Sequence, residues 1–293
     1  MRPVMTSGRL SLAGKRRIVE MIAGASKVPA GVVVESAAIA GVPVQRVTPP
    51  NARLDSTILL LHGGGYASGS AQGYRGLAGE LATAANIQII VADYRLAPEH
   101  PFPAALDDAF AVYRALSERV STIAIAGDSA GGGLTLALAQ RIRDASLPAP
   151  AALGLICPWL DLALDADALR PPRKDPLIVP ELIAEWCTFY VGNRDAREPG
   201  ISPIYGNVAS LPPIVMHSAG DDPLALDADK LERELVAQSS GLLIHRRYNN
   251  LWHDFHLQVG FLAEADHAVA LFGEQLAELV AAQHLPAERQ PRQ

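Results

Sequence analysis

The most informative stretch of the chain reads TIAIAGDSAGGG, at residues 122–133. The short apolar run at 122–126 predicts a buried strand, and the residues from about 130 to 143 predict a helix. Gly127-x-Ser129-x-Gly131 lies between them. A serine at a sharp strand-to-helix turn is held in a strained backbone conformation with its hydroxyl exposed, and the helix N-terminus adds a partial positive charge behind the oxygen. Ser129 is therefore the candidate nucleophile.

A second segment supports this interpretation, because Gly-x-Ser-x-Gly alone could equally be an ordinary glycine-rich loop. Residues 59–66 read LLLHGGGY, a strand that ends in His-Gly-Gly-Gly. Consecutive glycines allow backbone N–H groups to converge on a ligand oxygen, as an oxyanion hole requires. We predict Gly63 and Gly64 as the donors from this loop and Ala130 as the donor after the nucleophile. Gly65 is a weaker candidate.

A rival interpretation of the same loop is a dinucleotide-binding fingerprint. Gly63-x-Gly65-x-x-Ser68 follows a strand, and Asp93 stands where a ribose-binding acid would be expected. The third glycine of that fingerprint is missing, and His62 has no role in it. Both facts disfavour the dinucleotide interpretation.

The nucleophile needs a base, and two histidines remain after the others are assigned to strands, helices or unrelated loops. His253 follows a predicted strand by a short loop, at the sheet edge where Ser129 emerges, whereas His256 is expected to begin the next helix. We therefore predict His253 as the base.

The orienting acid is expected in the loop after the predicted strand at 214–217, which contains Asp221 and Asp222. Pro223 disfavours the helical conformation for the residue before it, so Asp222 is expected to be extended at the strand exit and to face the base. The order Ser129, Asp222, His253 is the nucleophile, acid, base order of α/β-hydrolases. These three residues form the predicted catalytic triad.

The rest of the chain predicts a single α/β domain of 293 residues with a mostly parallel sheet and helices on both faces. Residues 32–35 and 42–47 are expected to be antiparallel edge strands. The predicted core strands are 57–61, 87–91, 122–126, 153–156, 214–217 and 242–245. The predicted helices are about 73–85, 104–118, 130–143, 224–238 and 260–283. Residues 1 to about 30 and about 160 to 205 fall outside this alternation and are expected to form a helical cap.

Composition excludes several other classes of function. The chain has 25 basic and 31 acidic side chains, a formal net charge of −6, and no clustered basic face for nucleic acid. Two cysteines are too few for a disulfide framework or a four-ligand metal site. No apolar run has the length of a signal peptide or membrane span. We expect a cytoplasmic protein without metal or organic cofactor, acting on a small-molecule ester, with a homodimer left open.

The motifs together resemble the bacterial hormone-sensitive-lipase family (family IV) of carboxylesterases. The likeness rests on the two glycine motifs, on the segment DYRLAPEHPFPA at 93–104 and on CPWLD at 157–161. The resemblance implies an α/β-hydrolase fold with a cap. It also implies an acid directly before Pro-Leu, matching Asp222, and a base in a His-x-Phe setting, matching His253.

Other residues of the resemblance are expected to be architectural. Asp93, Arg95 and Glu99 are predicted to form a buried ion-pair network beside the oxyanion loop, and Asp128 to brace it. In the cap, apolar side chains are expected either to line the acyl pocket or to dock the cap on the core. They are Leu182, Ile183, Trp186, Phe189 and Tyr190.

The predicted activity is hydrolysis of carboxylic esters with short to medium acyl chains through an acyl-serine intermediate. An amidase or a specialised deacetylase would use the same triad and is the alternative. A non-catalytic small-molecule receptor of the same fold lacks the base, and the presence of His253 argues against it.

Overall fold

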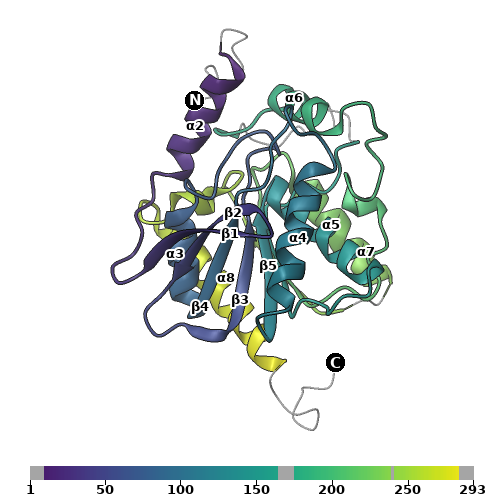
Figure 1. The fold of residues 1–293 in the computed structure, drawn as a ribbon. Helices are drawn as coiled ribbons and strands as arrows, with labels where there is room; N and C mark the ends of the chain where they lie inside the picture. The colour runs from purple at the N-terminus through teal and green to yellow at the C-terminus, as the bar shows by residue number, and fades with distance from the viewer. Residues whose placement is uncertain (1–9, 164–174, 239–240, 284–293) are drawn as a thin grey trace.

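The central sheet organises the molecule (Figure 1). A computed structural model describes residues 10–163, 175–238 and 241–283. Within these residues the sheet has eight strands in the order β1-β2-β4-β3-β5-β6-β7-β8. The strands are β1 (Val33–Ile39), β2 (Val42–Thr48), β3 (Arg53–Leu61), β4 (Ile87–Ala92), β5 (Thr122–Asp128), β6 (Leu153–Ile156), β7 (Ile214–Ala219) and β8 (Leu243–Tyr248).

Only the first two strands depart from parallel pairing. β1 pairs antiparallel with β2, and β2 pairs antiparallel with β4, whereas the pairs from β4 through β8 are parallel. The predicted mostly parallel sheet with helices on both faces is therefore confirmed. β2 differs from the prediction because it lies between β1 and β4 and is not an edge strand. Pro43 is compatible with this position because pairing with β4 begins at Val44.

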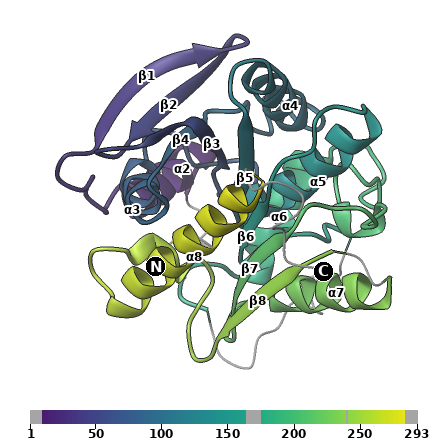
Figure 2. The same cartoon turned by 90° about the horizontal axis from the view of Figure 1, so that it is seen from below.

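Helices cover both faces of the sheet (Figure 2). α3 (Arg75–Ala85) and α8 (Ala263–Ala282) pack together on one face, and α4 (Ala104–Ser117), α5 (Ala130–Asp144) and α7 (Ala225–Ala237) lie on the other. Each face has its own buried apolar cluster. β5 is buried along its whole length, as expected for a central parallel strand.

Two helices from distant parts of the chain lie above the sheet (Figure 1). They are α2 (Leu12–Ala23) and α6 (Pro180–Val191). The buried Lys15 of α2 forms an ion pair with Glu185 of α6, which ties the two predicted cap segments together. Residues 1–9 and 164–174 of those segments lie outside the described residues.

None of the helices in the described part of the chain combines the length and the apolar character that crossing a lipid bilayer would require.

Candidate active site

Ser129 lies at the turn between β5 and α5, where the sequence places it. Its backbone has φ 53° and ψ −120°, an unfavourable conformation for a residue with a side chain. The flanking glycines make the turn sterically feasible. A Cβ on Gly127 would lie 2.3 Å from the Gly131 carbonyl oxygen, and one on Gly131 would lie 1.9 Å from the Leu61 oxygen. The local sequence thus fixes the strained turn that presents the hydroxyl.

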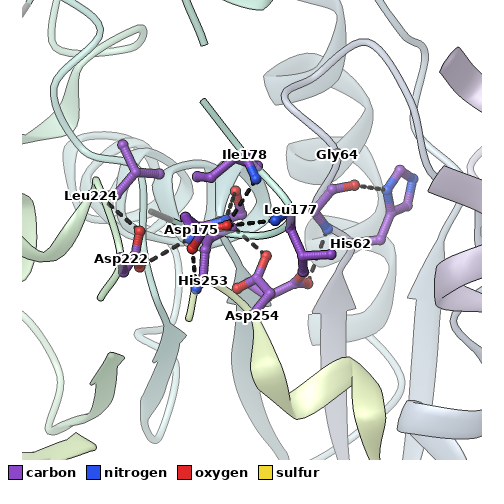
Figure 3. Close-up of polar contacts among 12 residues, drawn as sticks. His62, Gly64, Asp175, Leu177, Ile178, Asp222, Leu224, His253 and Asp254 are labelled. Atoms are coloured by element: carbon purple, nitrogen blue, oxygen red, sulfur yellow. Dashed lines mark hydrogen bonds and ion pairs between the residues drawn. The ribbon is translucent and has the colours of Figure 1, made fainter. Parts of the chain in front are cut away.

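The structure brings the three predicted triad residues together from distant parts of the chain. His253 Nε2 lies 2.8 Å from Ser129 Oγ, and His253 Nδ1 lies 2.9 Å from Asp222 Oδ2. The backbone N–H of Leu224 donates to the other oxygen of Asp222 at 2.8 Å, which fixes the carboxylate (Figure 3). All three side chains are buried. The arrangement is a hydroxyl, an imidazole and a carboxylate in one hydrogen-bonded line.

Charges around His253 act in opposite directions on its protonation. Burial alone lowers the pKa of the imidazole, but the carboxylates of Asp222 and Asp254 outweigh it and raise the pKa well above 6.5. The site therefore stabilises the imidazolium that forms when a serine proton is taken up.

His256, the rejected alternative base, occupies a different environment. It lies in the short 3₁₀ helix η3 (Phe255–Gln258), and its Nε2 lies 3.1 Å from Nδ1 of His217 on β7. Burial, followed by repulsion from His217 and His253, lowers the pKa of His256 well below its ordinary value. His256 is a neutral core residue beside α8 and has no contact with Ser129 among the described interactions.

The oxyanion loop differs from the prediction at one glycine. The N–H of Gly63 already donates to Asp128 Oδ1 at 2.9 Å and to the Tyr74 hydroxyl at 3.0 Å, so it is not available to a substrate. Within the described residues, the N–H groups of Gly64, Gly65 and Ala130 have no protein acceptor. We therefore transfer the predicted role of Gly63 to Gly65 and keep Gly64 and Ala130.

Asp128 braces this loop as the sequence predicts. Besides Gly63, it accepts a hydrogen bond from the Tyr74 hydroxyl at 2.6 Å. Because Asp128 directly precedes Ser129, the contact ties the oxyanion loop to the nucleophile turn. Burial raises the pKa of Asp128 well above its usual range.

The predicted network of Asp93, Arg95 and Glu99 is wrong. These residues make three separate contacts: Asp93 accepts from the Ala71 N–H, Arg95 pairs with Asp108, and Glu99 pairs with Arg16 of α2. The Arg95 and Glu99 side chains are about half exposed. Glu99 thus helps to fasten helix α2 rather than brace the interior.

Two carboxylates beside His253 were not identified from the sequence (Figure 3). Asp175 accepts from the backbone N–H of His253 at 2.7 Å, and its other oxygen accepts from the N–H groups of Leu177 and Ile178. Asp254 Oδ2 lies 3.0 Å from His253 Nε2. Asp175 follows a proline-rich stretch without periodicity, and Asp254 is the variable residue of His-x-Phe, so no pattern identifies either residue.

A small apolar pocket opens at Ser129. It encloses about 60 Å³, and its walls come from α2, the 175–178 segment, α6 and the oxyanion loop. Trp186 packs against the glycine loop so closely that a Cβ on Gly65 would lie 2.2 Å from the indole. Of the five apolar cap residues singled out in the sequence, only Trp186 lines this pocket, and the others pack on the core.

One group of side chains in the described residues has ligand atoms close enough to hold a metal ion. Atoms of Cys157, Asp222 and His253 lie within 4.8 Å of one another. Asp222 and His253 already bond to each other, and burial raises the pKa of the Cys157 thiol well above its ordinary value. A metal here would break the Asp222–His253 hydrogen bond and need a thiolate that the site disfavours.

The fold and the Ser–His–Asp geometry define a serine hydrolase of the α/β-hydrolase type. Comparison with known proteins agrees: the model of the alpha/beta hydrolase fold family matches residues 58–257. The chain belongs to this family, and its likeness to bacterial hormone-sensitive-lipase esterases, predicted from the motifs, is confirmed.

Three similar proteins illustrate the relationship. "Putative acetyl-hydrolase LipR" of Mycobacterium tuberculosis is 52% identical over 278 residues, covering 94% of this chain and 90% of LipR. The crystal structure of an esterase from the bacterial hormone-sensitive lipase family has a TM-score of 0.89 at 31% identity, covering 95% of each chain. The structure of EstE5 soaked with p-nitrophenyl butyrate has a TM-score of 0.86 at 33% identity, covering 94% of each chain. The predicted enzyme class, a carboxylic ester hydrolase, is confirmed at this level.

Asp222 and Asp221 provide a test of the acid. Asp222→Asn keeps the shape but removes the charge facing His253 Nδ1, and the precedent in a serine protease is a loss of about 10⁴-fold in kcat. Asp221 is half-buried and its backbone N–H bonds to Leu251, so Asp221→Asn should keep kcat within a few-fold. Measuring both variants with one soluble ester separates them. A normal rate in Asp222→Asn together with collapse in Asp221→Asn would reverse the assignment.

Proposed function

We propose that this protein is a serine carboxylesterase that cleaves esters of short acyl chains through an acyl-serine intermediate. The observation that carries the proposal is the hydrogen-bonded line from Asp222 through His253 to Ser129, which ends in an apolar pocket. A nucleophile with its base in contact and an oriented base is the arrangement that acyl transfer requires.

In the first half-reaction, Ser129 Oγ attacks the ester carbonyl carbon while His253 Nε2 takes the serine proton. The carbonyl oxygen becomes an oxyanion and accepts hydrogen bonds from the N–H groups of Gly64 and Ala130, with Gly65 as the third donor. Each such donor typically lowers the barrier by about 2.7–4 kcal/mol. His253 then gives its proton to the leaving alkoxide, and the acyl group stays on Ser129.

In the second half-reaction, water replaces the alcohol. His253 takes a proton from the water, the resulting hydroxide equivalent attacks the acyl carbon, and the proton returns to Ser129 Oγ as the carboxylic acid leaves. Asp222 stays ionised throughout and stabilises the imidazolium in both steps.

The size of the pocket supports the short end of the predicted range of acyl chains. Its volume of about 60 Å³ is far below the roughly 300–1,000 Å³ of ordinary ligand sites. Val19 and Ile22 of α2, with Trp186 of α6, close it from above. The name acetyl-hydrolase given to LipR and the butyrate ester soaked into EstE5 crystals agree with short chains.

A graded series of p-nitrophenyl esters tests this preference. We expect kcat/KM to be highest for acetate to butyrate and to fall by at least about tenfold at octanoate, because longer chains do not fit the pocket. Trp186→Ala removes a wall and should move the optimum to longer chains. Phe189→Ala is the control, since Phe189 lies on the same helix but does not line the pocket. An unchanged optimum in Trp186→Ala would contradict this account of chain length.

The amidase alternative uses the same three residues and differs only in the leaving group. A matched pair of substrates, p-nitrophenyl acetate and p-nitroacetanilide, discriminates between the two activities. We expect the ester to be hydrolysed far faster, and preferential cleavage of the anilide would overturn the esterase proposal.

A further inference from the structure

Asp254 occupies an unusual place in the active site. Its carboxylate oxygen Oδ2 lies 3.0 Å from His253 Nε2, the same nitrogen that lies 2.8 Å from Ser129 Oγ. The side chain is buried and lines the pocket, and its second oxygen, Oδ1, has no hydrogen-bond partner among the residues that the structure describes. His253 is thus flanked by carboxylates on both ring nitrogens, whereas the triad requires only the one at Nδ1.

The short distance between Nε2 and Oδ2 has a chemical consequence. Asp222 accepts the Nδ1 proton of His253, so in the neutral imidazole Nε2 carries a lone pair. A lone pair and a carboxylate oxygen repel each other at 3.0 Å, whereas an imidazolium and a carboxylate attract each other. The contact is therefore favourable when His253 is an imidazolium and Asp254 a carboxylate.

The form that this contact favours leaves His253 unable to act as a base. The imidazolium carries its second proton on Nε2, directed at Ser129 Oγ, so it cannot take the proton of Ser129. Hydrolysis needs the form from which that proton has been lost to solvent, with Asp254 ionised and Nε2 free. The pair titrates as a unit, since its two groups are in direct contact.

We propose that Asp254 is a positioning residue that holds a proton on His253 in the resting enzyme and thereby sets the lowest pH at which the esterase is active. The inference rests on the proposed function, because it assigns a role to Asp254 in the same reaction. Asp254 acts through His253 and is not itself a triad member.

Several titratable groups besides Asp254 also face His253. Asp222 lies against Nδ1 of His253, and Asp175 accepts a hydrogen bond from the backbone N–H of His253. Neutral His256 lies on the core side. Burial lowers the pKa of His253, but the two flanking carboxylates outweigh burial and raise this pKa. The titratable groups around His253 are Asp128 at the end of β5, Cys157 after β6, Asp222 after β7, Asp175 from the 175–178 segment, and Asp254 and His256 from its own loop. All of them except Asp254 remain in the variants below.

Asp254 can be replaced without strain. Its backbone is left-handed, with φ 50° and ψ 36°, a conformation that glycine adopts freely and asparagine tolerates. Asp254→Gly removes the carboxylate, and Asp254→Asn keeps its volume without a charge. Asp221→Asn is the matched control, because it removes one negative charge from the residue next to Asp222.

The first test is the pH dependence of kcat/KM for a short p-nitrophenyl ester, which reports groups of the free enzyme. An adjacent carboxylate shifts a partner's titration by about 1 to 3 pH units. We therefore expect the acid limb of the kcat/KM profile, where activity falls as pH is lowered, to move to lower pH by about 1 to 3 units in both Asp254 variants. It should stay in place in Asp221→Asn. Acid limbs of Asp254→Gly and Asp254→Asn that coincide with that of the wild type would overturn the proposal. A purely structural role would change the rate without moving the limb.

The second test does not depend on activity. In the Ser129→Ala background, ¹⁵N-labelled histidine reports the protonation of His253 Nε2 by NMR, and its midpoint should fall when Asp254→Gly is added. An unchanged midpoint contradicts the inference even if the proposed esterase activity fails. Conversely, wild-type protein that hydrolyses no ester refutes the proposed function and leaves the NMR result to decide the role of Asp254.

Discussion

Ser129→Ala is expected to lower the turnover of a p-nitrophenyl ester by about 10⁴- to 10⁶-fold, down to the residual rate that binding and the oxyanion donors provide. The substitution removes only the Oγ atom, which lies 2.8 Å from His253 Nε2. No acyl-enzyme can then form, so the burst of p-nitrophenol that signals acylation should also disappear.

Folding must be checked in this variant because the turn at Ser129 is strained. Alanine tolerates φ 53° no better than serine does, so we expect circular dichroism and thermal unfolding close to those of the wild type. A folded Ser129→Ala protein that keeps most of the wild-type rate would show that Ser129 is not the nucleophile.

The central elements of the fold could be predicted because local sequence determines them. The Ser129 turn requires glycine at 127 and 131 for steric reasons, and both glycines are visible in the sequence. The alternation of short apolar runs and helices likewise predicts a parallel sheet, and the order of the triad residues along the chain follows from that topology. The turn, the strands and the helices depend on residues close together in sequence, and the order of the triad then follows from the topology that they build.

The features that escaped prediction depend on contacts between distant segments. Gly63 looked equivalent to Gly64 in the sequence, but Asp128, which is 65 residues away, accepts its N–H. Asp175 reaches His253 from 78 residues away, and no spacing rule connects them. Arg95 and Glu99 are neighbours in sequence, yet each pairs with a different element, so a shared network could not be distinguished from separate contacts before the fold was known.

Asp254 was missed for a different reason. Its neighbour His253 was identified from its setting, and the residue between His253 and Phe255 carries no requirement in that pattern. Its backbone is left-handed, and its carboxylate lies beside Nε2. The sequence pattern indicates neither this conformation nor this contact, so it does not show that a second carboxylate lies beside the base.

His253→Ala is expected to be nearly as damaging as the loss of Ser129, with a fall in turnover of about 10⁴- to 10⁶-fold, because the nucleophile and the base act as a unit. Without the imidazole, the Ser129 hydroxyl has no group to take its proton, and Asp222 and Asp254 lose the cation that they jointly stabilise. The double variant with Ser129→Ala should be little slower than either single variant, which is the signature of residues that work together.

His256→Gln is the matched control for His253→Ala. His256 Nε2 lies 3.1 Å from His217 Nδ1, and we expect the Gln side chain to offer His217 a hydrogen-bonding group in place of the imidazole. We expect the folded variant to keep turnover within a few-fold of the wild type, although its melting temperature should fall because a buried ring is replaced. Turnover has to be normalised to folded protein, measured by thermal unfolding of the same samples. If His256→Gln then abolished turnover while His253→Ala spared it, the base would be His256, and the line from Asp222 to Ser129 would need another explanation.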